Sequence, residues 1–168
     1  MSGPDDSRRA FLAGGTDGPY LRTGDLGCVA DGHLFVTGRI KDVLIVRGLK
    51  HYPHDIEATA EGAHRALRPG CCAAFAVERE GEESVAVIAE VDARFGCELD
   101  DELGTDAIRA IRRAVAESHQ LALQAVALVP AGTLPKTTSG KLQRFLCRAG
   151  FLEGALVPLA AWHEQVAS

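Results

Sequence analysis

The order of apolar patterns in the middle of this sequence constrains its fold more than any other feature. Residues 72–77 and 85–91 are short apolar runs separated by a charged turn that contains a glycine, and both are typical of β-strands. Residues 101–119 carry apolar side chains at helical spacing, and residues 125–129 form another apolar run that ends at Pro130. This strand–strand–helix–strand order predicts a small mixed α+β domain with a central three-stranded sheet flanked by helices.

A β-rich segment precedes this domain. We expect a strand over residues 20–26 and a hairpin in which Asp31-Gly32 joins 28–30 to 33–37, because Asp-Gly is a common two-residue hairpin turn. We expect this segment to belong to something other than the α+β domain. The remaining expected elements are an irregular lead-in over 1–19, a strand over 43–46 that ends at Gly48, a helix opened by Pro53, and a basic last helix over 142–152.

Composition excludes several classes of protein. A formal net charge of −5 argues against broad nucleic-acid binding, and no apolar run is long enough to span a membrane. The first residues have no signal-peptide core, and the five cysteines are odd in number and lack Cys-x-x-Cys spacing. We therefore expect a cytoplasmic protein with reduced thiols. His51 and His54 have no partner at metal-ligand spacing, so we expect surface or helix-capping histidines and no metal site.

A loop over residues 135–141 carries the strongest chemical signal. It reads Pro-Lys-Thr-Thr-Ser-Gly-Lys, which offers small hydroxyl side chains, a glycine for a tight turn and the mobile positive charge of Lys141. These residue types suit a phosphate group, although the spacing is not that of a Walker A loop. By itself the loop is equally compatible with a solvated surface turn.

Three separated segments together resemble the last core motifs of the adenylate-forming enzymes. They are Thr23-Gly24-Asp25, then residues 38–42 with 46–48, and finally the loop that ends in Lys141. That superfamily includes acyl-CoA synthetases, luciferases, nonribosomal-peptide adenylation domains and fatty acyl-AMP ligases. Three motifs in a fixed order, spread over nearly the whole chain from Tyr20 onward, are far more specific than any one of them.

The resemblance implies a role for each matching residue. Asp25 would bind the ribose hydroxyls of ATP or of the acyl-adenylate, and Arg39 would bind ribose or phosphate oxygens. Lys141 would be the catalytic lysine that stabilises charge when a carboxylate attacks the α-phosphate. Charged groups of these kinds are suited to such contacts, because a carboxylate accepts hydrogen bonds and a guanidinium donates several.

The resemblance also implies movement. Lys41 and Asp42 correspond to the hinge on which the small C-terminal domain turns, and Arg47 and Gly48 to the segment that lines the pantetheine tunnel after the rotation. The acceptor would be the phosphopantetheine arm of an acyl carrier protein.

Three further patterns distinguish the branches of the superfamily. Residues 51–57 read His-Tyr-Pro-His-Asp-Ile-Glu, and with residues 68–71 and 144–148 they are similar to fatty acyl-AMP ligases. Those enzymes pass the acyl group to a carrier protein and reject free coenzyme A. The alternatives are a long- or medium-chain acyl-CoA synthetase and a non-catalytic module that docks a carrier protein.

The sequence contains no counterpart of the large domain's ATP loop or acyl pocket. We therefore expect residues 1–40 to be the tail end of a large adenylation domain and residues 41–168 to be its mobile C-terminal domain. ATP and Mg would be bound mainly by that large domain, so the chain alone should be inactive. Its partners would be its own N-terminal adenylation domain and a carrier protein or a polyketide or nonribosomal peptide synthase.

Overall fold

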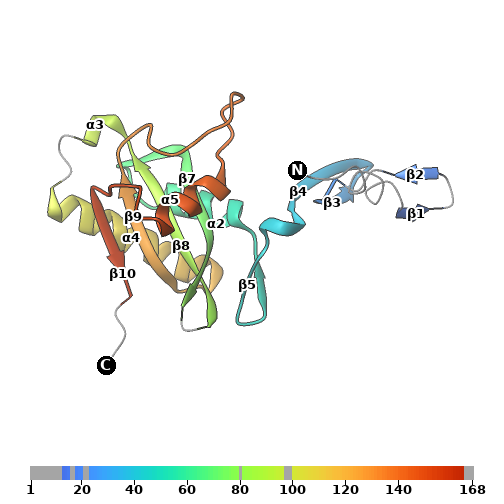
Figure 1. Cartoon of the computed structure of the whole chain (residues 1–168), viewed down its shortest axis with the longest axis horizontal. Coiled ribbons are helices and arrows are strands. Elements are labelled where there is room, and N and C mark those ends of the chain that lie inside the picture. Colours follow the sequence, from blue (N-terminus) through green and yellow to red (C-terminus); the bar gives the residue numbers. More distant parts are fainter. Residues whose placement is uncertain (1–12, 16–17, 21–22, 80, 97–99, 165–168) are drawn as a thin grey trace. The chain divides into compact units, whose positions relative to one another are not determined.

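The chain divides into two compact units, Met1–Val43 (unit 1) and Leu44–Ser168 (unit 2). Figure 1 draws both units, coloured along the sequence. The computed structural model describes residues 13–15, 18–20, 23–79, 81–96 and 100–164.

The described residues of unit 1 form two small antiparallel strand pairs. The short strands β1 (Ala13–Gly15) and β2 (Gly18–Tyr20) pair with each other, and β3 (Asp25–Ala30) pairs with β4 (His33–Arg39). The turn of the second pair is Asp31-Gly32, whose φ angles of 51° and 76° are both positive, as a two-residue type I′ turn requires. The hairpin predicted around Asp31-Gly32 is therefore confirmed.

The strand expected over residues 20–26 is wrong in the part that the structure describes. Strand β2 ends at Tyr20, Thr23 and Gly24 lie outside any strand, and β3 begins only at Asp25. Gly24 has a φ of 76°, and this left-handed conformation interrupts the extended backbone. Residues 21–22 lie outside the described residues. The lead-in expected to be irregular contains β1 and β2.

Unit 2 is built on one sheet of four strands in the order β10-β9-β8-β7. The strands β7 and β8 are antiparallel, β8 and β9 are parallel, and β9 and β10 are antiparallel. The mixed α+β prediction is confirmed, but the sheet has a fourth strand, β10, that the sequence did not predict. The strands are β7 (Leu67–Arg79), β8 (Glu82–Val91), β9 (Leu123–Val129) and β10 (Ala160–His163).

The helices of unit 2 begin where the sequence provides a start signal. Pro53 is the first residue of α2, and the side chain of Asp100 accepts a hydrogen bond of 2.8 Å from the Leu103 N–H at the start of α4. The amphipathic helix expected over 101–119 is confirmed, while the last helix begins at Arg144, two residues later than expected. The helices are α2 (Pro53–Gly62), α3 (Ala93–Gly96), α4 (Asp101–His119) and α5 (Arg144–Leu152).

The sheet of unit 2 is covered on both faces. Along β8, Val85 and Val87 belong to the apolar cluster that includes residues of α2 and α4, whereas Ala86 and Ile88 belong to the cluster that includes Cys147 of α5. Side chains alternate between the two faces of a strand, and all four of these β8 residues are fully buried. In Figure 1 the segment between β9 and α5 projects from this body. Unit 2 therefore has cores of its own and presents one protruding loop.

Candidate functional site

Asp25 and Arg39 lie side by side across the hairpin of β3 and β4. They are directly paired residues in the register, and the Arg39 Nε donates a hydrogen bond of 3.1 Å to the Asp25 Oδ1. Their backbone is held by two further bonds, from the Ile40 N–H to the Gly24 carbonyl at 2.8 Å and from the Asp25 N–H to the Thr23 Oγ1 at 3.1 Å. Both side chains face solvent, with 69% of Arg39 and 34% of Asp25 exposed. A carboxylate and a guanidinium are thus held together and can bind a ligand that carries hydroxyl and phosphate groups.

The residues expected to form a hinge lie in a single turn of 3₁₀-helix. This turn, η1 (Ile40–Asp42), follows β4 directly, and the backbone becomes extended again at Val43. The boundary between the two units falls one residue further on, between Val43 and Leu44. Short 3₁₀ turns are common connectors and are frequent at hinges.

Arg47 and Gly48 form the tip of a second hairpin, made by β5 (Leu44–Val46) and β6 (Leu49–His51) in unit 2. Their φ angles of 50° and 78° again define a two-residue type I′ turn. Both residues are exposed. An added Cβ at Gly48 would meet no atom within 4 Å, so the structure requires glycine there for its backbone conformation and not for space.

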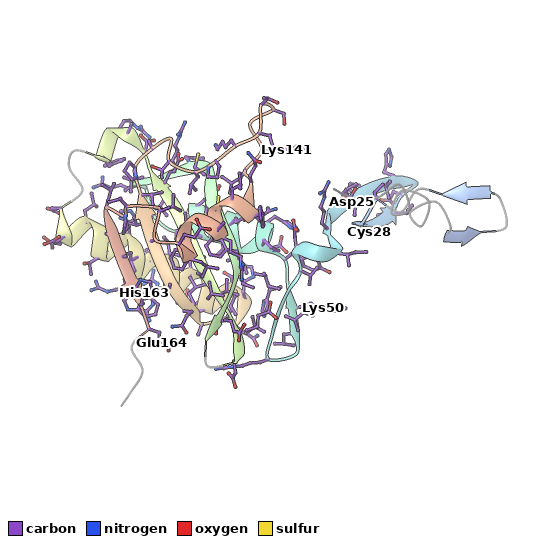
Figure 2. All side chains as sticks on the ribbon, in the orientation of Figure 1. Asp25, Cys28, Lys50, Lys141, His163 and Glu164 are labelled. Atoms are coloured by element: carbon purple, nitrogen blue, oxygen red, sulfur yellow. The ribbon has the colours of Figure 1, made fainter. Side chains whose placement is uncertain are left out.

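Lys141 lies in the projecting loop of unit 2, as Figure 2 shows. The loop is itself a small hairpin: the Thr137 N–H donates to the Lys141 carbonyl at 2.8 Å, and the Gly140 N–H donates to the Thr137 carbonyl at 2.8 Å. Gly140 has a φ of 82°, which is the left-handed residue of a three-residue hairpin turn. Lys141 is exposed at the end of this turn, so its ammonium group is presented to solvent from a defined backbone.

The loop hydroxyl groups make bonds inside the hairpin. The Thr137 Oγ1 accepts a hydrogen bond of 3.0 Å from the Lys141 N–H and lies 2.9 Å from the Ser139 Oγ. In this structure two of the hydroxyl groups that suit a phosphate instead shape the turn. The sequence signal for phosphate chemistry in this loop therefore rests on Lys141.

The segment before Lys141 is attached to the sheet by Glu90 and Lys136. Glu90, on β8, is fully buried, and its Oε1 accepts a hydrogen bond of 2.8 Å from the Leu134 N–H. Its Oε2 accepts one of 2.7 Å from the Arg68 side chain. The Lys136 Nζ donates at 3.0 Å to the Gly70 carbonyl and also lies 3.0 Å from the Cys71 Sγ. Lys136 thus positions the loop.

The surroundings of Glu90 favour the charged form of its carboxyl group. Burial alone would raise the pKa of its carboxyl group, but hydrogen bonds from the Gly132 and Leu134 N–H groups and from Arg68 outweigh burial and hold the pKa below its ordinary value. A buried charge is stable only when it is paired and hydrogen-bonded.

The segment after Lys141 is attached to α2 by Glu57. The Arg144 Nε and Nη2 donate hydrogen bonds of 2.6 and 2.7 Å to the two oxygens of Glu57. Glu57 also accepts a bond of 3.0 Å from the Ala74 N–H on β7, which is an edge strand. Such a bidentate arginine–carboxylate pair fixes the relative orientation of the two side chains as well as the distance between them. The role of Glu57 and Glu90 in attaching this segment was not predicted from the sequence. For Glu90 there was a signal, because it is an acidic residue inside the apolar run of β8.

The two histidines considered from the sequence differ in burial. His51 is only 9% exposed, and burial together with the nearby His119 lowers the pKa of its imidazole. The expectation of a surface or capping histidine is therefore wrong for His51, which is buried at the end of β6 while Tyr52 is the N-cap residue of α2, whereas His54 is exposed as expected.

Other candidate site features are few. Within the described ranges, no three His, Cys, Asp or Glu side chains gather as metal ligands would. In the same part of the chain, no helix combines the length and apolar character that a membrane crossing needs. Cys71, Cys72 and Cys147 are buried, Cys28 is exposed, and Cys97 lies outside the described residues.

Comparison with known proteins finds one matching family model and several similar proteins that are named as ligases of fatty acids. A family model described as "Disco-interacting protein 2-like, AMP domain" matches residues 41–160. The chain is 50% identical over 147 residues to the medium-chain-fatty-acid–[acyl-carrier-protein] ligase JamA of Moorena producens (strain JHB), a match that covers 88% of this chain and 24% of JamA. It is 41% identical over 154 residues to fadD25 of Mycobacterium tuberculosis (strain CDC 1551 / Oshkosh), which is named as a fatty-acid–CoA ligase, with 86% and 25% covered.

A solved structure of a fatty acid AMP ligase is also similar to this chain. The crystal structure of a fatty acid AMP ligase from Legionella pneumophila is similar with a TM-score of 0.59 and 40% identity, over 96% of this chain and 28% of that chain. The chain therefore spans about a quarter of the length of the curated relatives it matches.

Proposed function

The chain belongs to the fatty acyl-AMP ligase branch of the adenylate-forming superfamily, and we propose that it is the C-terminal portion of such a ligase. In this proposal the whole protein activates a fatty acid with ATP to an acyl-adenylate. It then passes the acyl group to the phosphopantetheine arm of an acyl carrier protein in the cytoplasm. The similarity to JamA, whose name includes a carrier-protein acceptor, supports that choice of partner.

The observation that carries the proposal is the boundary between the two units. It falls between Val43 and Leu44, one residue beyond Asp42, and it places the Asp25–Arg39 pair in unit 1 and Lys141 in unit 2. We propose that residues 1–40 complete a large adenylation domain and that residues 41–168 are the mobile C-terminal domain. The η1 turn, with Lys41 and Asp42, would be the hinge, since a hinge needs only a few residues that absorb a backbone rotation.

The proposed chemistry follows from the charges that each unit presents. Asp25 would accept hydrogen bonds from the ribose hydroxyls, and Arg39 would donate to ribose or phosphate oxygens. Lys141 would approach the α-phosphate, hold the attacking carboxylate in line and stabilise the negative charge that gathers on the oxygens as pyrophosphate leaves. ATP and its magnesium ion would be bound mainly by the large domain.

The second half of the reaction would use the other hairpin. We propose that rotation of unit 2 withdraws Lys141 and brings Arg47 and Gly48 to the path of the pantetheine arm. The exposed type I′ turn supports this role, because it offers a narrow, defined backbone at the tip of the hairpin.

The choice of acceptor is tested on the full-length protein that carries this chain. Purified protein with ATP and a fatty acid should transfer the acyl group to a holo carrier protein and give little acyl-coenzyme A, measured by mass spectrometry of both products. Fast acyl-coenzyme A formation would instead assign an acyl-CoA synthetase, the second candidate, which the similarity to fadD25 favours.

The chain by itself should not catalyse ATP–pyrophosphate exchange with fatty acids, since the nucleotide and acyl sites are expected on the large domain. Binding of a holo carrier protein to the chain alone, followed by NMR, tests the remaining alternative of a docking module. Exchange activity in the purified chain would contradict the proposed division of the site.

A further inference from the structure

Two carboxylates that the proposed chemistry does not use are directed at the segment that carries Lys141. Glu90 is fully buried and Glu57 is only 8% exposed. Glu90 accepts a backbone hydrogen bond from Leu134, and Glu57 binds the Arg144 side chain through both oxygens. One acid therefore holds the segment before Lys141, and the other holds the segment after it.

Each acid also connects the segment to a rigid part of unit 2. Glu90 is a residue of β8, a central strand with a neighbour on each side. Glu57 lies on α2 and also accepts the Ala74 N–H of β7. The segment is thereby fastened to the middle of the sheet at one end and, through α2, to the sheet edge at the other.

A surface loop that has no anchoring contacts is usually mobile. This one has an internal hydrogen-bonded turn and two charged anchors in places where water competes little for the bonds, so it has few ways to move separately from the sheet. Buried carboxylates are costly to keep, and packing alone would be served as well by apolar residues of similar size. Glu90 also pairs with Arg68 and Glu57 also accepts the Ala74 N–H, but what the two acids have in common is a bond to this one segment.

We propose that Glu90 and Glu57 are positioning residues for Lys141, which make the 134–144 segment turn as one body with the sheet of unit 2. This inference rests on the proposed function. Lys141 then reaches the nucleotide through rotation of the whole unit and not through a loop that reorients by itself.

The first test needs no activity and uses the present chain. In a weakly aligned sample, the N–H residual dipolar couplings of Thr137, Gly140 and Lys141 should fit the alignment tensor of the sheet. In Glu90→Gln these couplings should shrink by about half or more, while those of β8 and β9 keep their values, because a loosened segment averages its orientation. Unchanged couplings in the variant would overturn the proposal.

The second test compares the two half-reactions in the full-length protein. Glu90→Gln should lower the rate of acyl-adenylate formation by about ten- to a hundredfold, since small misplacements of a catalytic group are costly. The loss should be in kcat with the KM for ATP unchanged. Transfer from a supplied acyl-adenylate to a holo carrier protein should stay within about twofold, because Lys141 acts only in the first half-reaction.

The matched control is Asp92→Asn. Asp92 lies two residues beyond Glu90 and also pairs with an arginine, Arg94, at 2.8 Å, although this pair is more exposed, and none of its hydrogen bonds reaches the Lys141 segment. This variant should leave both half-reactions within about twofold. Equal losses in both half-reactions of Glu90→Gln would mean a general loss of structure and would overturn the positioning role.

Glu57→Gln provides an independent route if Glu90→Gln fails to fold, with Glu61→Gln, one turn later on α2, as its control. Glu57→Gln should also shrink the couplings of the segment and slow adenylation selectively. If the wild-type protein makes no acyl-adenylate, the proposed function fails, and the couplings still decide the positioning role.

Discussion

The β3–β4 hairpin of unit 1 and the four-stranded sheet of unit 2 differ in how well their apolar side chains are covered. In unit 1 the β3–β4 hairpin leaves apolar side chains in solvent, with Val29 72%, Leu34 71% and Val36 67% exposed. In unit 2 the sheet is packed on both faces, and Ile88 on its central strand is fully buried. A two-stranded hairpin is at best marginally stable alone, so the β3–β4 hairpin gains little stability from its own packing, whereas the sheet of unit 2 has buried cores on both faces.

This difference matters for the proposed function. The pair proposed to bind the nucleotide, Asp25 and Arg39, lies on the unit with the exposed hairpin, while the proposed catalytic lysine lies on the unit with the packed sheet. Such a division lets a self-contained domain move a single charged group relative to a site built elsewhere. Three sets of substitutions test whether the units differ in this way. The largest expected effect is the loss of acyl-adenylate formation, and the smallest is a change of about 1 kcal/mol in the free energy of unfolding.

The largest expected effect is that of Lys141→Ala in the full-length protein. Removing the ammonium group should slow acyl-adenylate formation by a hundred- to a thousandfold or more, the range known for single groups that stabilise transition-state charge, measured by ATP–pyrophosphate exchange. The unfolding midpoint of unit 2 should not change, because Lys141 is exposed. Lys50→Ala, an exposed lysine of the same unit labelled in Figure 2, is the control and should keep normal exchange. Normal adenylation in Lys141→Ala would remove this residue from the catalytic role.

The second effect concerns stability. Ile88→Ala should lower the unfolding free energy of the chain by about 2–5 kcal/mol, since it removes buried methyl groups and leaves a cavity in unit 2. Leu34→Ala in unit 1 removes a comparable volume but should change the unfolding free energy by less than about 0.5 kcal/mol, because the Leu34 side chain is already in solvent. Urea denaturation followed by circular dichroism measures both. An equally large effect of Leu34→Ala would show that the β3–β4 hairpin is packed within the chain.

The sequence predicted the local features well because each has a local cause. Asp31-Gly32 specifies a type I′ turn through the positive φ that these residue types tolerate, and the helix at 101–119 has apolar spacing and Asp100 as its cap. The position of Lys141 after a glycine turn is also a local property. Each of these features depends on residues that are close to one another in the sequence.

The features that the sequence did not reveal depend on distant partners. Strand β10 has only four residues, and it is defined by its pairing with β9 and by Trp162, over whose ring the Arg112 guanidinium lies at 3.4 Å. Glu90 meets Leu134 across 44 residues, and Glu57 meets Arg144 across 87. An isolated acid in an apolar strand signals that a partner exists, but only the fold identifies it.

The smallest expected effect compares the two type I′ turns. Gly48→Ala should lower the unfolding free energy of the chain by about 1–2 kcal/mol, because alanine is strained at the φ of 78° found there. Gly32→Ala introduces the same strain at a φ of 76° in unit 1, yet it should leave that unfolding transition unchanged, since the hairpin there contributes little to the core. Gly62→Ala on α2 is a control of opposite sign and should stabilise by about 0.4–1 kcal/mol, because the residue is helical and an added Cβ meets nothing within 4 Å. Equal losses for Gly48→Ala and Gly32→Ala would mean that the two units unfold together, and the separation on which the proposed lysine delivery depends would not hold in the free chain.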